Sequence, residues 1–347
     1  MAARRPTLVV TMGDPAGIGP EIVLRAASHP AARRAARLVI AGEPEVMERA
    51  ASRLASRVRL RFIDPHAHDL RDDGPGIALI ASSQEGWSAI QPRQPSAASG
   101  MMAARAIETA AALALEGRVD GIVTAPISKT ALQAAGYPYP GHTEFLGALA
   151  RAPETRMLFV GESFRILLAT VHLALRRVPD ALTTESLVRT MEVAAAALRN
   201  FRWGTRRAIA VLGLNPHAGE GGLFGDEERR VIAPAIERAR EMGIHAEGPY
   251  PADTFFAQHE GRRDLGAVIA MYHDQGLIPA KSGGIGGAAN VTLGLPFVRS
   301  SVDHGTAFDR AWRGGARAPD PAGLTTAIRV GADLALRAKR PLEWTWP

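Results

Sequence analysis

Three histidines follow short apolar runs of the sequence: His172 in ATVH, His217 in LNPH and His273 in YHD. Three neutral imidazoles can bind Zn²⁺ or a similar divalent ion and leave it the full charge of a strong Lewis acid. Two other interpretations stay open for His273, as half of a catalytic couple with Asp274 or as a polar residue ending a strand. The chain has no cysteine, so thiolate ligands and cysteine nucleophiles are excluded.

A second set of side chains suits an anionic ligand. It consists of His142, Thr143, Lys281, Asn290 and Arg299. His142 follows a glycine in a predicted loop, although a plain helix-capping role is also open to it. The glycines after Lys281 predict either close approach of the backbone to a ligand or a mobile lid. Asp253, after a proline-containing turn, is a candidate carboxylate for catalysis or a helix cap.

Six apolar runs alternate with alanine-rich stretches of helical length and are predicted to form a sheet. They are residues 7–13, 37–43, 120–128, 165–173, 207–217 and 265–276. This alternation predicts an α/β fold with a mainly parallel, buried sheet. Ligands bind outside the carboxyl ends of such strands. The endings GDP, TAP, TVH, LNPH and YHD are therefore expected to line an active site.

Length and composition narrow the class of protein. A chain of 347 residues favours two domains, or one large α/β body divided by a cleft. The formal charge of +6 comes from scattered arginines, which argues against nucleic-acid binding and suits an anionic small substrate. No apolar stretch approaches the roughly 20 residues of a membrane span. We therefore expect a cytoplasmic protein without a membrane partner.

Together these stretches resemble the 4-hydroxythreonine-4-phosphate dehydrogenase family of vitamin B6 biosynthesis and its sugar-acid-phosphate relatives. The matching motifs include TMGDPAGIGPEI, GHTEFL, LNPHAGEGGLFGDEE, YHDQGLIPAK and NVTLGLPFVRSSVDHGTAFD. The resemblance implies two α/β/α domains flanking a central cleft, as in isocitrate and isopropylmalate dehydrogenases. Residues 1–127 plus 295–347 would form the cofactor-side domain. Residues 128–294 would form the metal, substrate and dimerisation domain of a homodimer.

The resemblance also assigns roles to residues. The metal ligands would be His172, His217 and His273, one of them from the neighbouring subunit. Substrate would be bound by His142, Thr143, Lys281, Asn290 and Arg299. Lys281 and Asp253 would be catalytic. The stretch SVDHGTAFDRA is similar to the cofactor segment of isocitrate dehydrogenases, which makes His304, Gly305, Thr306 and Asp309 candidates for binding NAD or NADP.

The implied reaction is oxidation, with coupled decarboxylation, of a phosphorylated four-carbon 3-hydroxy acid, assisted by Zn²⁺ or by Co²⁺, Mg²⁺ or Mn²⁺. The substrate would be 4-phosphohydroxy-L-threonine or D-threonate or D-erythronate 4-phosphate. The sequence departs from the family at Ile285, where relatives carry an aromatic residue, and at Trp312 and Arg313. The alternative hypotheses are a metal-dependent phosphatase or lyase, a cis-diol dehydrogenase of aromatic-acid degradation, and a binding protein without catalytic activity.

Overall fold

The computed structural model describes residues 4–54, 58–66, 70, 74–282, 287–314, 318–339 and 342–344. The chain forms two compact units. Unit 1 comprises residues 1–155 and 289–336, and unit 2 comprises residues 156–288 and 337–347. Both units are discontinuous in sequence, whereas of the predicted domains only the cofactor-side one is, and the units and the predicted domains divide the chain at different residues. The predicted division into a cofactor-side domain and a metal and substrate domain therefore stays a prediction.

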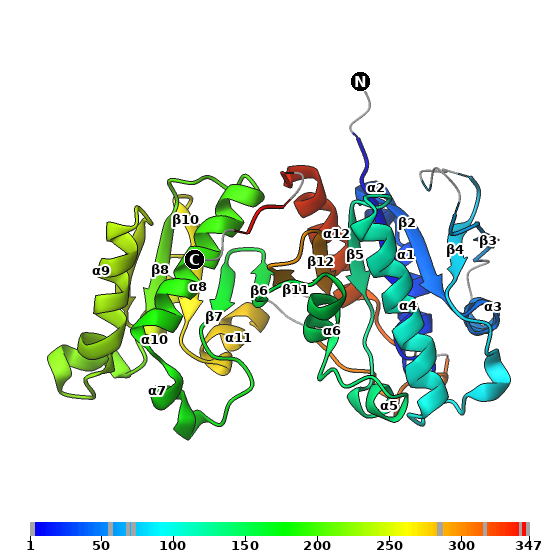
Figure 1. Ribbon diagram of the computed structural model, residues 1–347, viewed down its shortest axis with the longest axis horizontal. Helices are drawn as coiled ribbons and strands as arrows, with labels where there is room; N and C mark the ends of the chain where they lie inside the picture. The colour runs from blue at the N-terminus through cyan, green and yellow to red at the C-terminus, as the bar shows by residue number, and fades with distance from the viewer. Residues whose placement is uncertain are drawn as a thin grey trace. The chain divides into compact units, whose positions relative to one another are not determined.

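Unit 1 is built on a sheet with the strand order β3-β4-β2-β1-β5-β12-β11 (Figure 1). The strands are β1 (Thr7–Thr11), β2 (Arg37–Gly42), β3 (Leu60–Phe62), β4 (Ile77–Ala81), β5 (Gly121–Thr124), β11 (Ala288–Leu293) and β12 (Val298–Ser301). All pairs are parallel except β11 with β12. Strands β1, β5 and β12 are buried along their whole length, as expected for a sheet covered on both faces.

Helices cover both faces of the unit 1 sheet. They are α1 (Gly19–Ser28), α2 (Pro30–Ala35), α3 (Pro44–Arg53), η1 (Trp87–Ala89), α4 (Ala97–Leu115), α5 (Lys129–Ala134), α6 (His142–Leu149) and α12 (Ala322–Arg337). Helix α4 and α6 pack with Val9 and Ile122 in one core cluster. On the opposite face Ser300 donates to the Ala327 carbonyl of α12 at 2.8 Å. Successive residues along each strand thus point to opposite faces of the sheet and contact different helices.

Unit 2 has the strand order β6-β7-β10-β8-β9. The strands are β6 (Arg156–Gly161), β7 (Arg165–Leu168), β8 (Ala208–Leu212), β9 (Ala246–Tyr250) and β10 (Leu265–Ala270). The helical segments are η2 (Leu175–Arg177), α7 (Val178–Ala181), α8 (Thr184–Asn200), η3 (Pro216–Gly222), η4 (Glu228–Ile232), α9 (Ala233–Glu241), α10 (Ala252–Gln258) and α11 (His273–Lys281). Only β6, which pairs with β7, is antiparallel. Phe159, Phe255 and Leu277 help to form a core on the side of α10 and α11.

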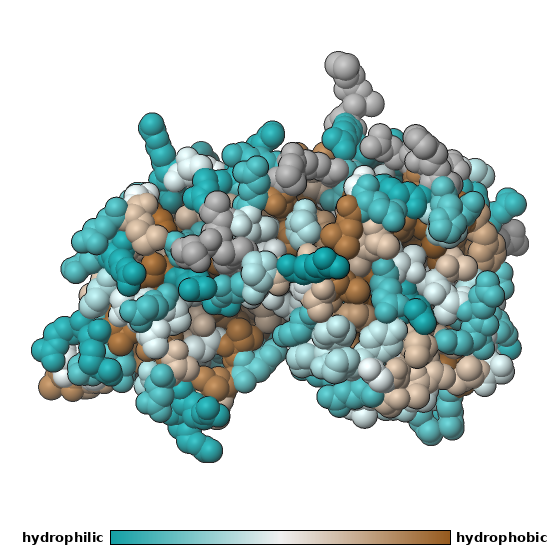
Figure 2. Space-filling view, viewed as in Figure 1, coloured by the Kyte–Doolittle hydropathy of each residue, from teal (hydrophilic) through white to brown (hydrophobic). Residues whose placement is uncertain are grey.

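The α/β class with mainly parallel strands is confirmed, and each of the six predicted runs contains a strand, from β1 to β10. Hydrophilic side chains cover much of the face in view, with hydrophobic ones interspersed (Figure 2). Among the described residues, no helix is both long and apolar enough to span a bilayer.

Candidate functional site

Two of the three predicted metal ligands lie together in unit 2. His172 follows β7 and His273 follows β10, and these strands are parallel neighbours. Their imidazole centroids are 5.7 Å apart. With metal–nitrogen bonds of about 2.1 Å, two imidazoles on one tetrahedral ion have centroids roughly 5 Å apart, so this pair fits a shared divalent ion. Neutral nitrogen donors of this kind suit Zn²⁺ or Co²⁺.

Asp274 is in hydrogen-bonding contact with one of these rings. Its Oδ1 lies 2.7 Å from Nδ1 of His273. A carboxylate there favours a proton on Nδ1 and leaves the lone pair of Nε2 for a metal. This geometry suits a histidine that binds a metal with a supporting carboxylate, and it does not require a catalytic His-Asp couple.

Side-chain hydrogen bonds tie together the strand ends that carry the histidines. Thr170 Oγ1 donates to the Met271 carbonyl at 2.7 Å, which links the β7 and β10 ends. Gln275 Oε1 accepts from the Met271 amide, and its Nε2 donates to the Gly213 carbonyl after β8, both at 2.7 Å. Sequence reasoning missed Gln275, although it stands two residues after His273 in the YHDQG motif. It connects the His273 and His217 loops.

His217 itself is exposed on the loop after β8. In the part of the chain that the structure describes, no three histidine, aspartate or glutamate side chains are grouped closely enough to hold a metal. One chain thus brings together His172 and His273 but not the full predicted set of three. Leu223 and Phe224, in the same loop as His217, are 74% and 49% exposed. Two adjacent exposed apolar side chains are compatible with a surface that another protein covers.

The two predicted catalytic residues also belong to unit 2. Lys281 is the last residue of α11 and is exposed. Asp253 is the second residue of α10, also exposed, and the cap position before it is Pro251. Asp253 therefore has a carboxylate open to solvent and does not serve as the helix cap that was one of its two interpretations. Ile285, where the sequence departs from its relatives, lies outside the described residues.

Arg299 forms the centre of a second group, in unit 1. It lies on β12 and is only 3% exposed. Its Nη1 donates to Thr292 Oγ1 at 2.8 Å and its Nη2 donates to Thr124 Oγ1 at 2.7 Å. Its Nε is buried without a hydrogen-bond partner. Among the described residues no carboxylate forms an ion pair with Arg299, and burial lowers its pKa to about 10.

Two further predicted binding residues have buried polar atoms without partners. Nε2 of His142 and Oδ1 of Asn290 make no hydrogen bond with the described chain. Burial, and then the charge of Arg299, holds the pKa of His142 well below its usual range, so the imidazole is neutral. On β11, Asn290 and Thr292 are two residues apart and project from the same face of the sheet. A buried cation beside buried polar atoms without partners suits a polar anionic ligand, one of whose hydroxyl groups could donate to the Asn290 oxygen.

The predicted loop around His142 is in fact the start of helix α6. Gly141 occupies the N-cap position, and His142 and Thr143 are the first two helical residues. No side chain caps this end of the helix. The backbone N–H groups of the first turn therefore add donors of the kind that anions bind. The alternative that His142 merely caps a helix is wrong.

The predicted cofactor residues lie on the loop after β12 in unit 1. His304, Gly305 and Asp309 are exposed, and a Cβ on Gly305 would meet no atom within 4 Å. The loop is anchored to the β1–α1 loop, because the Ile18 amide donates to the Thr306 carbonyl at 3.0 Å. Open side chains on an anchored backbone can contact a ligand.

Trp312, one of the predicted departures from the family, anchors the same loop at its other end. The indole Nε1 donates to the Pro15 carbonyl at 2.9 Å, and the Trp312 amide donates to Glu21 Oε2 at 2.7 Å. The ring also packs edge-on against Trp87, with centroids 4.7 Å apart. Trp312 is 7% exposed and has a φ of 59°, a conformation that favours glycine. The hydrogen bonds and the ring contact of Trp312 offset the cost of this backbone conformation.

Comparison with known proteins matches residues 34–330 to the family described as pyridoxal phosphate biosynthetic protein PdxA. The chain belongs to the PdxA family. It is 43% identical to a 4-hydroxythreonine-4-phosphate dehydrogenase of Trichlorobacter lovleyi, over 96% of this chain and 99% of that protein. It is 40% identical to a D-threonate 4-phosphate dehydrogenase of Pectobacterium atrosepticum, over 94% of this chain and 99% of that protein.

A solved structure agrees with this assignment. The 4-hydroxythreonine-4-phosphate dehydrogenase of Klebsiella pneumoniae superposes with a TM-score of 0.85 at 40% identity, covering 96% of this chain and 99% of that one. The predicted family is therefore confirmed. As a PdxA-family protein, the chain is an enzyme of the oxidoreductase class.

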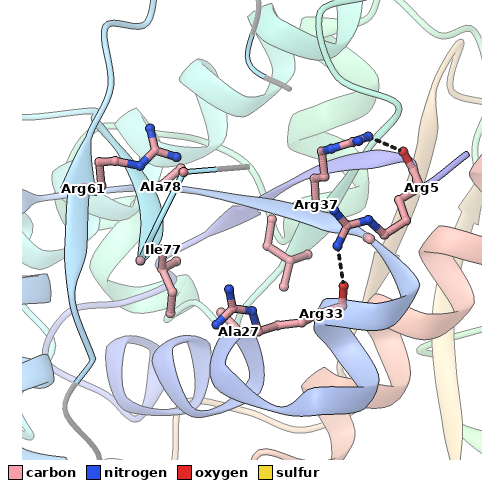
Figure 3. Close-up of a pocket in the computed structure, with 11 residues that line it drawn as sticks. Arg5, Ala27, Arg33, Arg37, Arg61, Ile77 and Ala78 are labelled. Atoms are coloured by element: carbon pink, nitrogen blue, oxygen red, sulfur yellow. Dashed lines mark hydrogen bonds between the residues drawn. The ribbon is translucent and has the colours of Figure 1, made fainter. Parts of the chain in front are cut away.

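Unit 1 also has a pocket lined by basic side chains, and none of the candidate site residues described above lines it (Figure 3). Arg5, Arg33, Arg37 and Arg61 line it, near the amino ends of β1, β2 and β4. Arg5 donates to the Arg33 carbonyl at 3.3 Å, and Arg37 donates to the Arg5 carbonyl at 3.0 Å. Ligands of open α/β sheets bind at the opposite, carboxyl ends. We therefore place the functional site on the loops that follow the strands.

Proposed function

We propose that this PdxA-family enzyme oxidises and decarboxylates a phosphorylated four-carbon 3-hydroxy acid with NAD or NADP and a divalent metal ion. The substrate would be 4-phosphohydroxy-L-threonine, giving 3-amino-2-oxopropyl phosphate, or D-threonate or D-erythronate 4-phosphate, giving dihydroxyacetone phosphate. The observation that carries the proposal is the buried guanidinium of Arg299, which donates to two hydroxyls and, among the described residues, forms no ion pair with a carboxylate, although the charge of Glu144 acts on it. A phosphate or carboxylate of the substrate would supply the missing charge.

Arg299 would act with the neighbouring unit 1 residues as the binding site for that anion. His142 offers its buried Nε2, Thr143 lies in the first turn of α6, and the buried Oδ1 of Asn290 would accept from a hydroxyl group of the same substrate. Thr124 and Thr292 fix the plane of the guanidinium before the ligand arrives. Such preorganisation lowers the cost of binding, because the side chains lose little freedom when the ligand is bound.

The remaining candidate residues would act at the reacting end of the substrate. His172, His273 and His217 would hold the metal, and Lys281 or Asp253, the latter through water, would take the proton of the hydroxyl group. When bound, the metal stabilises developing negative charge on oxygen, and the nicotinamide accepts the hydride. His304, Gly305, Thr306 and Asp309 are proposed to bind the cofactor. Lys281 is also proposed as a substrate contact.

We further propose that the enzyme is a homodimer in which His217 serves the site of the neighbouring subunit. Two features support this: His217 is not grouped with the His172–His273 pair, and its loop exposes Leu223 and Phe224. An interface there would bury these side chains and complete the ligand set.

Calorimetric binding of D-threonate 4-phosphate and of D-threonate would test the anion site. A phosphate clamp built on Arg299 should make the phosphorylated acid bind at least roughly 10-fold more tightly, because charge-assisted hydrogen bonds to a buried cation are lost with the phosphate. Equal affinity for both acids would contradict the proposal. A metal-dependent phosphatase would instead release inorganic phosphate during the titration.

A further inference from the structure

The loop that carries His217 has an unusual backbone. Five consecutive residues, from His217 to Gly221, have positive φ angles of 54°, 52°, 82°, 43° and 68°. Three of them, His217, Ala218 and Glu220, are not glycine. L-residues avoid this left-handed region because Cβ approaches the following carbonyl oxygen. A run of this kind persists only where surrounding groups hold it, and such strained segments cluster at functional sites.

Glu228 is the group that holds this loop. It begins the π-helical turn η4 and is 6% exposed. Its Oε1 accepts from the amides of Leu214 and Asn215, both at 2.7 Å. Its Oε2 accepts from Asn215 Nδ2 at 2.9 Å. One carboxylate therefore binds three N–H groups at the start of the loop, two or three residues before His217.

The loop backbone also packs directly on this carboxylate. A Cβ on Gly219 would lie 2.7 Å from Glu228 Oε2, so only glycine fits there. In the described part of the chain no arginine, lysine or histidine forms an ion pair with Glu228. A buried carboxylate is costly unless it is hydrogen-bonded, and the three N–H donors given above all come from the loop. The negative charge of Glu228 is thus stabilised by N–H groups of the loop that carries His217.

We propose that Glu228 is a positioning residue that presents the His217 imidazole for metal binding. The proposal rests on the proposed function, in which His217 is a metal ligand. Glu228 does not contact the metal in this account. It fixes Leu214 and Asn215, which set the path of the left-handed run and hence the direction of the His217 side chain. Outer residues that orient a ligand typically change metal affinity roughly 10- to 100-fold when removed.

The test compares Glu228→Ala and Glu228→Gln with the control Glu220→Gln in the full-length protein. Glu220 lies in the same loop and is exposed. The first readout is the dissociation constant for Co²⁺, measured by titration. The second is hydrogen exchange of the Leu214 and Asn215 amides in metal-free protein. We expect Glu228→Ala to lose amide protection and to bind Co²⁺ roughly 10- to 100-fold more weakly.

Glu228→Gln should be affected less, because its amide oxygen can still accept from both backbone amides, and the control should match the wild type. Lost protection with unchanged Co²⁺ affinity would overturn the positioning role and leave the proposed function intact. A wild-type protein that binds no divalent ion would instead overturn the proposed function, and the positioning role with it. Should Glu228→Ala fail to fold, the same comparison between Glu228→Gln and Glu220→Gln decides.

Discussion

The imidazole rings of His172 and His273 lie 5.7 Å apart, centroid to centroid, beyond the ends of two adjacent parallel strands. If they share one ion, His172→Ala and His273→Ala should each weaken Co²⁺ binding by more than the roughly 10- to 100-fold that loss of an outer residue costs. His245→Ala is the matched control, since His245 is exposed and precedes β9 at the other end of the sheet. Unchanged Co²⁺ titrations for either single variant would remove that histidine from the site.

If His217 serves the metal site of the neighbouring subunit, two variants that are inactive alone should regain activity when they form a mixed dimer. His172→Ala and His217→Ala should each be inactive as homodimers. In a mixed dimer one of the two sites has both wild-type histidines, so co-refolding equal amounts should restore about a quarter of the wild-type activity. If each site were built within one chain, the mixture would stay inactive, and that result would contradict the shared site.

The clamp around Arg299 predicts an effect on binding more than on chemistry. Arg299→Ala should raise KM for the phosphorylated substrate roughly 10- to 100-fold, with a smaller change in kcat, because the guanidinium contacts a non-reacting group. Steady-state kinetics with the phosphorylated acid and its dephosphorylated analogue would measure this. The role of Arg299 would be refuted by an equal loss with both substrates.

Asp14 predicts a pH dependence of stability. It follows β1 with 0% exposure, and burial raises its pKa from 3.8 to about 6 despite hydrogen bonds from the Ala16 amide and Ser99. Its protonated form favours the folded state, so this contribution is complete below about pH 4 and is lost as the pH rises through about 6. At about 1.4 kcal/mol for each pKa unit, the loss is about 3 kcal/mol.

Asp14→Asn cannot ionise and should lack this dependence. Urea unfolding of both proteins at several pH values would show the wild type losing stability relative to the variant between about pH 4 and about pH 6, with no further change above. A constant difference across this range would show that Asp14 has an ordinary pKa in the folded protein.

The sequence predicted the architecture well because its signals are local. Each buried strand from β1 to β10 that was expected from an apolar run is present, and the three histidines predicted as metal ligands follow three of these strands. Asn290 and Arg299 were predicted as donors but not as parts of strands, although they lie on the antiparallel strands β11 and β12. The alternation in ANVTL and VRSS was the signal for them, but nearby glycines obscured it.

The supporting residues were not predictable, because their partners are distant in sequence. Thr124 bonds Arg299 across 175 positions, and Gln275 reaches Gly213 across 62. Neither spacing follows from a helical or strand period. The left-handed run at His217 likewise depends on Glu228, whose bonds to the loop appear only when the chain is folded. The residue types in the sequence indicated which side chains could do chemistry, whereas hydrogen bonds between distant parts of the chain determine how those side chains are positioned.

The most direct test of the central claim is the reduction of NAD⁺ or NADP⁺, followed by absorbance. The purified protein would be given a divalent ion and 4-phosphohydroxy-L-threonine, D-threonate 4-phosphate or D-erythronate 4-phosphate in turn. We expect at least one acid to yield reduced nicotinamide and CO₂, and a chelator to stop the reaction. No reduced cofactor with any of the three acids, in the presence of metal, would contradict it.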